Sequence, residues 1–228
     1  LNRPGDIFFL NGAFPPTAEE IQAHTPTPVI FGEASVAKPY TAPSLFNISA
    51  MSYGALSGPA ISALSQGAYQ SGIWLNTGEG GLSPFHRQAP CDLIFQIGTA
   101  KYGVRDEQGR LDASKLTELA AIPEIKMFEI KLSQGAKPGK GGILPGEKVT
   151  EVIASTRGIP AGQDSISPNR HPEVTSVESL LDLIATVRDV SKKPTGIKFV
   201  LGQTQWLDDF CAAIHSRGIN SAPDFITL

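Results

Sequence analysis

Short apolar runs alternate with stretches of helical periodicity from residue 45 to the end of the chain. The apolar runs predict strands at 45–51, 73–78, 92–98, 126–132, 196–201 and 224–228. The periodic stretches predict helices near 57–71, 112–121, 147–157, 175–191 and 204–217. Because the strands are short and continuously apolar, both of their faces are expected to be buried, as in a parallel sheet.

Two of the predicted helices carry clear amphipathic signals. In 175–191, one face holds Val177, Leu180, Leu181, Ile184 and Val187. Thr175 and Glu178 have the spacing of a capping box at the start of this helix. In 204–217, one face holds Leu207, Phe210, Cys211 and Ile214. Cys211 is therefore expected to be a core residue.

The alternation of strands and helices predicts an α/β fold with right-handed crossovers, either a doubly wound sheet or a (β/α)8 barrel. The turn after the first predicted strand, SAMSYGALSG, is not a dinucleotide-binding fingerprint, and the sequence contains no P-loop motif. Unusual residues instead follow strand after strand, where a barrel carries its active site. We therefore expect a (β/α)8 TIM barrel, of which the six strands form about six of the eight β/α units.

The first part of the chain differs from the rest. Residues 1–43 are polar and rich in proline, with few periodic apolar positions, and are expected to form an N-terminal arm rather than a core unit. The barrel would occupy residues 44–228. Because the chain starts at Leu1 and ends on the strand-like PDFITL, we expect it to be an excerpt of a longer protein, without the last two barrel units.

Composition excludes several classes of function. A net charge of −3 and a pI of about 5.8 give no overall field that would attract nucleic acid. Cys91 and Cys211 are far apart and form no CxxC pattern, which indicates a reducing compartment and no iron–sulfur site within these residues. No apolar run approaches the roughly 20 residues of a membrane helix. A cytoplasmic protein is expected, although an anchor could lie outside the excerpt.

The candidate site residues follow the predicted strands. Small residues around 50–52 either let a flat ligand approach the backbone or simply relieve crowding in the turn. Glu79, within NTGEGG, is either a solvated turn residue or a carboxylate that positions or protonates a substrate. Lys198 lies among apolar strand residues, and because burying an unpaired ammonium is costly, we expect it to contact a ligand or an ion-pair partner.

The four histidines show no spacing typical of metal ligands, so no metal site is expected. His86 and His171 lie in loops near the proposed site. Hydrogen-bonded loop histidines are far commoner than metal ligands, and this is the role we expect for them.

Several motifs occur in order along the chain: NISAMSYGALS, NTGEGG, EIKLSQGAKPGKGGILPGEKV, IASTRGIPAGQDSISP and GIKFV. Together they resemble the FMN-binding barrel of the glutamate synthase family, from about residue 31 to the end. The likeness is greatest to short members that lack the glutaminase domain. The resemblance implies an FMN-dependent oxidoreductase. In true glutamate synthases, reduced FMN delivers a hydride to 2-iminoglutarate, which forms from 2-oxoglutarate and ammonia.

The resemblance also implies roles for individual residues. Six would contact the flavin: Ala50, Met51, Ser52, Thr77, Gln96 and Lys198. The first three would lie along the isoalloxazine ring, the next two would bond its polar edge, and the lysine would lie near N1 and O2. A fixed cation there stabilises the negative charge of reduced flavin.

Three further residues would act on the substrate. Glu79 matches the catalytic glutamate of the family, and Lys137 and Arg157 match basic residues that bind a dicarboxylate. The chain departs from the family at Ile143, where true glutamate synthases have a glutamine that contacts 2-oxoglutarate. An isoleucine makes no hydrogen bond, so the resemblance supports FMN more strongly than it supports 2-oxoglutarate.

Two main hypotheses follow. The first is an FMN-dependent enzyme that reduces an imine or keto acid, with a small carboxylate substrate and an electron donor protein or NAD(P)H-linked reductase as partner. The second is a catalytically silent barrel that binds flavin or a carboxylate as a sensor or scaffold, which Ile143 favours slightly. A phosphate-sugar barrel without flavin is a third reading, against which Lys198 and the joint motif set count.

Overall fold

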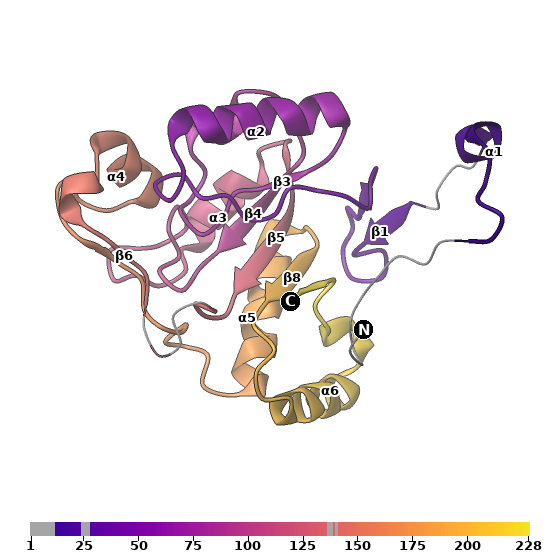
Figure 1. Ribbon diagram of the computed structural model, residues 1–228. Helices are drawn as coiled ribbons and strands as arrows, with labels where there is room; N and C mark the ends of the chain where they lie inside the picture. Colours follow the sequence, from indigo (N-terminus) through magenta and orange to yellow (C-terminus); the bar gives the residue numbers. More distant parts are fainter. Residues whose placement is uncertain (1–11, 24–27, 136–138, 140) are drawn as a thin grey trace, which may run out of the picture.

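The computed structural model describes residues 12–23, 28–135, 139 and 141–228 (Figure 1). A curled sheet of five parallel strands lies at its centre, in the order β3-β4-β5-β8-β9. The strands are β3 (Leu75–Asn76), β4 (Leu93–Ile97), β5 (Ile125–Lys131), β8 (Thr195–Lys198) and β9 (Ile226–Thr227). The sheet confirms the α/β class and agrees with part of a barrel, whereas the count of eight units stays a prediction.

The segment predicted as the first strand continues the sheet beyond β3. Ile48 forms a parallel bridge with Leu75. The Ile48 N–H donates to the Trp74 carbonyl and the Met51 N–H donates to the Asn76 carbonyl, each at 3.0 Å. The pairing is thus real but too short to count as a full strand.

The five predicted helices are all present and are separated from one another by strands or loops (Figure 1). They are α2 (Gly58–Ser71), α3 (Ala113–Ala120), α4 (Glu151–Arg157), α5 (Val177–Ser191) and α6 (Gln205–Arg217). The 147–157 prediction is split, because a short 3-10 turn at Gly146–Lys148 ends before Thr150 caps α4. Two other 3-10 turns occupy Pro84–Arg87 and Ile219–Ser221. No helix in the described ranges is long and apolar enough to cross a membrane.

The two faces of the sheet have different partners. In β4 and β5, Leu93, Phe95 and Phe128 belong to a core shared with the outer helices, especially α5. The alternate positions Ile94 and Met127 face the other way and pack with Tyr40 and other aromatic residues. Every residue of β4 is buried because both faces are covered.

Part of the predicted N-terminal arm contributes to this second cluster. β1 (Val29–Phe31) and β2 (Tyr40–Ala42) form an antiparallel hairpin. Tyr40 and Ala42 are buried, and Phe31 packs on the edges of the Trp74 and Phe225 rings. The expectation that residues 1–43 form no core is therefore wrong for the hairpin, because its aromatic rings cover the inner face of the sheet. Helix α1 (Ala18–Ala23) has no buried residue.

Two details of the helices differ from the predictions. Ser176, not Thr175, caps α5: its hydroxyl accepts from the Ser179 N–H, and the Ser179 hydroxyl completes the capping box. Glu178 instead pairs with Arg217 of α6. Cys211 is exposed rather than in the core. It follows Phe210, which is buried, and one residue turns a helix by 100°, enough to carry it off the apolar face.

Candidate functional site

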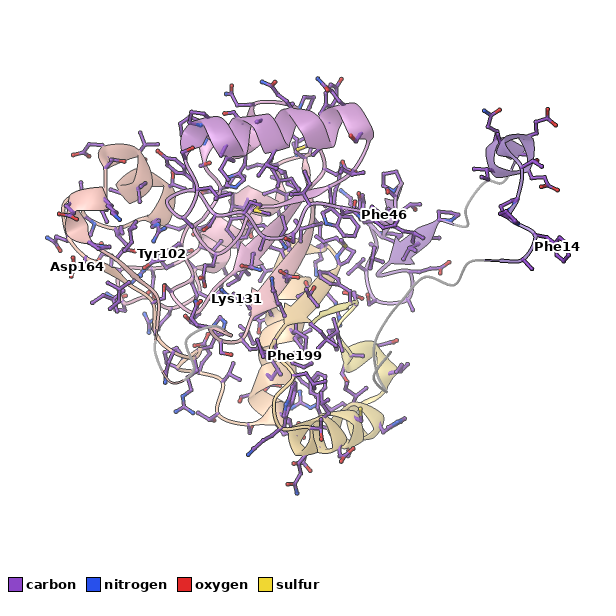
Figure 2. The ribbon with its side chains drawn as sticks, viewed as in Figure 1. Phe14, Phe46, Tyr102, Lys131, Asp164 and Phe199 are labelled. Carbon is purple, nitrogen blue, oxygen red and sulfur yellow. The ribbon has the colours of Figure 1, made fainter. Side chains whose placement is uncertain are left out.

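The site lies where β3, β4 and β5 end. Lys131, the last residue of β5, lies at the centre of the view in Figure 2. Its Nζ is 3.0 Å from Glu79 Oε1. The Gln134 amide donates to both Glu79 oxygens, at 2.8 and 2.7 Å. Both Glu79 and Lys131 are half-buried, so the ion pair is shielded from bulk water on one side.

Two glycines make room for Glu79. Gly78 has a φ of +66°, and a Cβ there would lie 2.7 Å from the Ser52 backbone nitrogen. A Cβ on Gly98 would lie 2.6 Å from the Cβ of Glu79. The glycines of NTGEGG and of the loop after β4 are therefore needed for the turn to pack against Ser52 and for Glu79 to reach Lys131.

Arg157, the last residue of α4, is only 8% exposed. Its guanidinium carbon lies 4.9 Å from the centroid of the Tyr102 ring, which lies toward α4 in Figure 2. One terminal nitrogen donates to the Ser165 hydroxyl at 2.9 Å and the other to the Tyr53 carbonyl at 3.4 Å. Its Nε has no hydrogen-bond partner among the described residues. The ring, the hydroxyl and the carbonyl hold the guanidinium in one orientation.

A cavity of about 210 Å³ brings several of these side chains together. Its walls include Ser52, Glu79, Tyr102, Gln134, Ile143 and Arg157. Ile143 belongs to the short antiparallel pair β6 (Ile143–Leu144) and β7 (Ser165–Ile166), which covers one side. Three predicted residues, Ser52, Glu79 and Arg157, thus share one cavity with the residue that departs from the family. Lys137 lies outside the described residues.

A second cavity of about 340 Å³ contains Ala50 and Lys198. Ser49, Asn76, Glu129 and Thr227 also line it, together with apolar side chains from the hairpin and the inner face of the sheet. Lys198 is partly rather than fully buried. The predicted flavin residues are therefore not gathered in one cavity: Ala50 and Lys198 line this one, and Ser52 lines the other.

The remaining predicted flavin residues are engaged with the protein itself. The Thr77 hydroxyl is buried, donates to the Gly78 carbonyl at 3.0 Å and accepts from the Gln96 N–H at 3.1 Å. The side-chain amide of Gln96 donates to Glu129 at 2.6 Å. Met51 contributes its backbone, since its carbonyl accepts from His86. The hydroxyl proton of Thr77 is thus already committed, whereas its oxygen and the Gln96 carbonyl can still accept.

Both loop histidines are buried and hydrogen-bonded to the backbone of the site. The Ser83 N–H donates to His86 Nδ1, so His86 Nε2 carries the proton and donates to the Met51 carbonyl at 2.8 Å. His171 Nε2 bonds the Lys131 carbonyl at 2.9 Å. Burial lowers the pKa of His86. Burial and the nearby Lys101 ammonium lower the pKa of His171. Both rings are therefore neutral supports of the loops that carry the site.

Among the described residues near the site, Lys101 is the most deeply buried cation, 1% exposed and with a φ of +53°. Its Nζ lies 3.0 Å from Glu173 Oε1. Glu173 is two residues from His171, so the ion pair fixes the loop that bonds the Lys131 carbonyl. The pair accounts for the burial of Lys101 without a ligand.

Lys131, Gln134 and Glu129 were not predicted as site residues. A usable signal existed in KMFEIKL, where Glu129 and Lys131 alternate with apolar residues. Period-two alternation places both charges on one face of the strand, here the inner face that points toward the cavities. The apolar residues of the segment predict a buried strand but do not reveal its charged face.

Comparison with known proteins places the chain in a family. The conserved region in glutamate synthase matches residues 16–227. A glutamate synthase large subunit-like protein, YerD of Bacillus subtilis, is 40% identical over 217 residues, which are 92% of this chain and 41% of that protein. The chain belongs to the glutamate synthase family.

Two further relatives of this glutamate synthase-family domain have enzyme names. The archaeal-type glutamate synthase [NADPH] of Thermotoga maritima is 42% identical over 181 residues, 78% of this chain and 32% of that protein. The archaeal glutamate synthase [NADPH] of Methanocaldococcus jannaschii is 40% identical over 153 residues, 66% of this chain and 28% of that protein. The domain spans less than half the length of each of these three relatives.

Proposed function

We propose that this glutamate synthase-family domain binds FMN and forms the part of an oxidoreductase that reduces an imine or keto acid carrying a carboxylate. The observation that carries the proposal is that Glu79, which is paired with Lys131, lines one small cavity together with the fixed guanidinium of Arg157. A guanidinium that can bind an anion and a carboxylate in the same cavity suit a substrate with both a carboxylate and a reacting carbon–nitrogen bond.

The residues of the second cavity fit a flavin. Its volume of about 340 Å³ is within the usual range for small-molecule sites, and its walls combine apolar side chains with a few polar groups. Ala50 and Ser49 are small enough for a ring to lie against the backbone. Lys198 offers a cation for the negative edge of reduced flavin. The bound FMN would supply the hydride.

The chain's own groups would bind and orient the substrate. Arg157 would bind the carboxylate, because each of its two terminal nitrogens keeps an N–H beyond the bonds to Ser165 and Tyr53. Glu79 would hold the N–H of an imine or the ammonia-derived nitrogen. Lys131 and Gln134 would hold the Glu79 carboxylate in one orientation.

The partners and the compartment belong to the same proposal. The relatives named as NADPH enzymes support an NAD(P)H-linked reductase or an electron donor protein as the source of electrons. The free cysteines and the absence of a membrane-length apolar run in the sequence support a cytoplasmic location.

Ile143 favours a second candidate, a barrel that binds flavin or a carboxylate without turnover. Its side chain is 63% exposed at the wall of the cavity and offers no hydrogen bond to a substrate carboxylate. A ligand-binding domain that has lost a substrate contact would serve as a sensor or scaffold.

The test uses the full-length protein and FMN. The visible absorption spectrum of the purified protein, before and after FMN is added, should contain the bound-flavin bands. A protein that neither carries nor gains them contradicts the enzyme and the flavin-binding form of the silent barrel. The bound FMN is then photoreduced without oxygen, and 2-oxoglutarate with ammonium is added. Reoxidation that needs both compounds supports the enzyme. Reoxidation by neither 2-oxoglutarate nor other 2-oxo acids supports the silent barrel.

A further inference from the structure

Glu129 is a buried carboxylate in the middle of the inner face of the sheet, 2% exposed. Its Oε1 accepts from Asn76 Nδ2 at 2.9 Å and from Gln96 Nε2 at 2.6 Å. Its Oε2 accepts from the Thr227 hydroxyl at 2.6 Å. Four strands of the sheet, β3, β4, β5 and β9, are thus joined through a single side chain.

None of the ion pairs formed among the described residues involves Glu129. A buried carboxylate without a cation is costly unless hydrogen bonds satisfy it, and here three neutral donors do so. The arrangement costs more than an apolar side chain would in the same place. The role of Glu129 therefore lies in its effect on the groups that donate to it.

An ionised carboxylate only accepts hydrogen bonds, so it dictates how the two amides are turned. Asn76 and Gln96 must point their NH2 groups at Glu129, which fixes where their carbonyl oxygens lie. The Asn76 oxygen accepts from the Gly78 N–H at 3.0 Å. Gly78 precedes Glu79, so the carboxylate of Glu129 sets the turn that carries the Glu79 side chain.

The second amide, that of Gln96, has an acceptor that the described residues leave free. With its NH2 held by Glu129, Gln96 keeps a carbonyl oxygen to which no described residue donates a hydrogen bond. The flavin ring has an N–H at its polar edge that needs such an acceptor. If the Gln96 amide were turned the other way, its NH2 group would face the flavin N–H, and two donors cannot form a hydrogen bond.

We propose that Glu129 is a positioning residue that fixes the amides of Asn76 and Gln96, and through them the Glu79 turn and the acceptor offered to the flavin. The part that concerns the flavin rests on the proposed function. The part that concerns the turn rests only on the two hydrogen bonds of the Asn76 amide, which donates to Glu129 and accepts from the Gly78 N–H.

The test compares two replacements of similar size in the full-length protein. Glu129→Gln removes the charge but keeps a carbonyl that accepts from both amides, with its NH2 directed at the Thr227 oxygen, which can accept. Glu129→Met removes the acceptors as well. Thr227→Val is the matched control, because it removes only the bond to Oε2.

Two properties are measured on each variant: the dissociation constant for FMN, by quenching of flavin fluorescence, and amide hydrogen exchange of the 76–81 turn. We expect Glu129→Gln to resemble the wild type in both. Thr227 lines the cavity proposed for the flavin, so Thr227→Val serves as a control for the exchange of the turn, which should match the wild type. Glu129→Met should weaken FMN binding about tenfold and speed exchange at Gly78 and Glu79 about tenfold, the loss of about one hydrogen bond. If the methionine variant does not fold, Glu129→Asp serves instead, since the shorter carboxylate retreats from both amides.

Other outcomes would contradict the positioning role of Glu129 or the proposed function. Equal effects of glutamine and methionine would show that the charge matters rather than the orientation of the amides, and would overturn the proposal. Unchanged exchange in the methionine or aspartate variant would also overturn it. A wild-type protein that binds no FMN contradicts the proposed function, but the exchange of the 76–81 turn still tests the positioning by Glu129.

Discussion

Ile143 puts a hydrocarbon side chain on the wall of the cavity that contains Glu79 and Arg157. Its neighbour across the short β6–β7 pair is Ile166, which is similarly exposed but does not line the cavity. The two isoleucines therefore allow the same substitution to be made inside and outside the site.

We expect Ile143→Gln to raise kcat/KM for 2-oxoglutarate with ammonium about tenfold, because the amide restores one hydrogen bond to a carboxylate. Steady-state kinetics of the full-length protein checks this. Ile166→Gln should leave kcat/KM unchanged. Equal kinetics for both variants and the wild type would mean that the substrate is a different 2-oxo or imino acid.

The buried imidazole of His171 makes stability depend on pH. Its pKa is lowered in the folded protein, by burial and by Lys101, so the unfolded chain binds a proton more readily below about pH 6.5. The stabilisation is complete above that pH and is lost as the pH falls. Burial raises the pKa of Glu173, but hydrogen bonds from its own backbone and from Lys101 outweigh burial and leave it below its usual value.

We therefore expect the free energy of unfolding to fall between pH 7.5 and pH 5.5, and to fall less in His171→Gln than in the wild type. Urea titrations at the two pH values measure the difference. Glu173 stays ionised throughout this window, so it does not contribute. An identical fall in the variant would contradict the assignment to His171.

Single residues divide into those that the sequence could identify and those that it could not. Glu79 stands out because glycines surround it, and Arg157 because a family motif contains it. Glu129 and Lys131 were recognisable as charges on one face of a strand, but their partners were not. Those partners depend on the register between β4 and β5, which shifts at Leu93 and Ile94, and the shift leaves no mark in the sequence.

At the scale of elements, the start of α5 distinguishes two neighbouring hydroxyl residues. Both Thr175 and Ser176 can cap a helix, and in the sequence the capping-box spacing of Glu178 favours Thr175. The structure selects Ser176, because its extended backbone lets the hydroxyl reach the Ser179 N–H.

Ser176→Ala should lower the free energy of unfolding by about 1 kcal/mol, the usual value of a lost N-cap. Thr175→Ala should lower it by less than about 0.5 kcal/mol, since only the Thr175 backbone takes part, through its N–H to the Ser179 hydroxyl. Urea unfolding of the two variants makes the comparison. A larger loss from Thr175→Ala would mean that the threonine caps the helix after all.

The elements themselves were largely predictable, since apolar runs and helical periodicity report burial directly. The antiparallel hairpin β1–β2 was not, because its strands are three residues each and are embedded in a proline-rich segment. Its place in the fold is set by aromatic packing on Trp74 and Phe225, which come from distant parts of the chain. Local patterns carry no information about such contacts.

At the scale of the whole molecule, Arg188 and Asp224 join α5 to the segment before β9. Their side chains are almost fully buried, with 3.2 Å between Arg188 Nε and Asp224 Oδ2. Asp224 also accepts from the Thr195 N–H and from the Ser35 hydroxyl. One carboxylate thus connects the hairpin region, the start of β8 and the last strand.

Asp224→Ala should lower the free energy of unfolding by about 3–5 kcal/mol, because it leaves the Arg188 charge buried without its partner. The matched substitution Asp182→Ala breaks the pair with Arg217 on the exposed side of α5 and α6, 2.6 Å long, and should cost less than about 1 kcal/mol. Urea unfolding at neutral pH measures both. Similar losses of unfolding free energy for the two variants would show that the buried Arg188–Asp224 pair contributes no more to stability than the exposed pair does.

The exposed thiol of Cys211 can be labelled selectively. Cys91, the other cysteine of these 228 residues, is buried, and burial raises the pKa of its thiol. Thiolate is the reactive form, so a maleimide dye at neutral pH should modify Cys211 first. Cys211 lines neither of the two cavities. A fluorophore on the outer helix α6 would therefore report on flavin uptake by energy transfer while leaving the site chemically untouched.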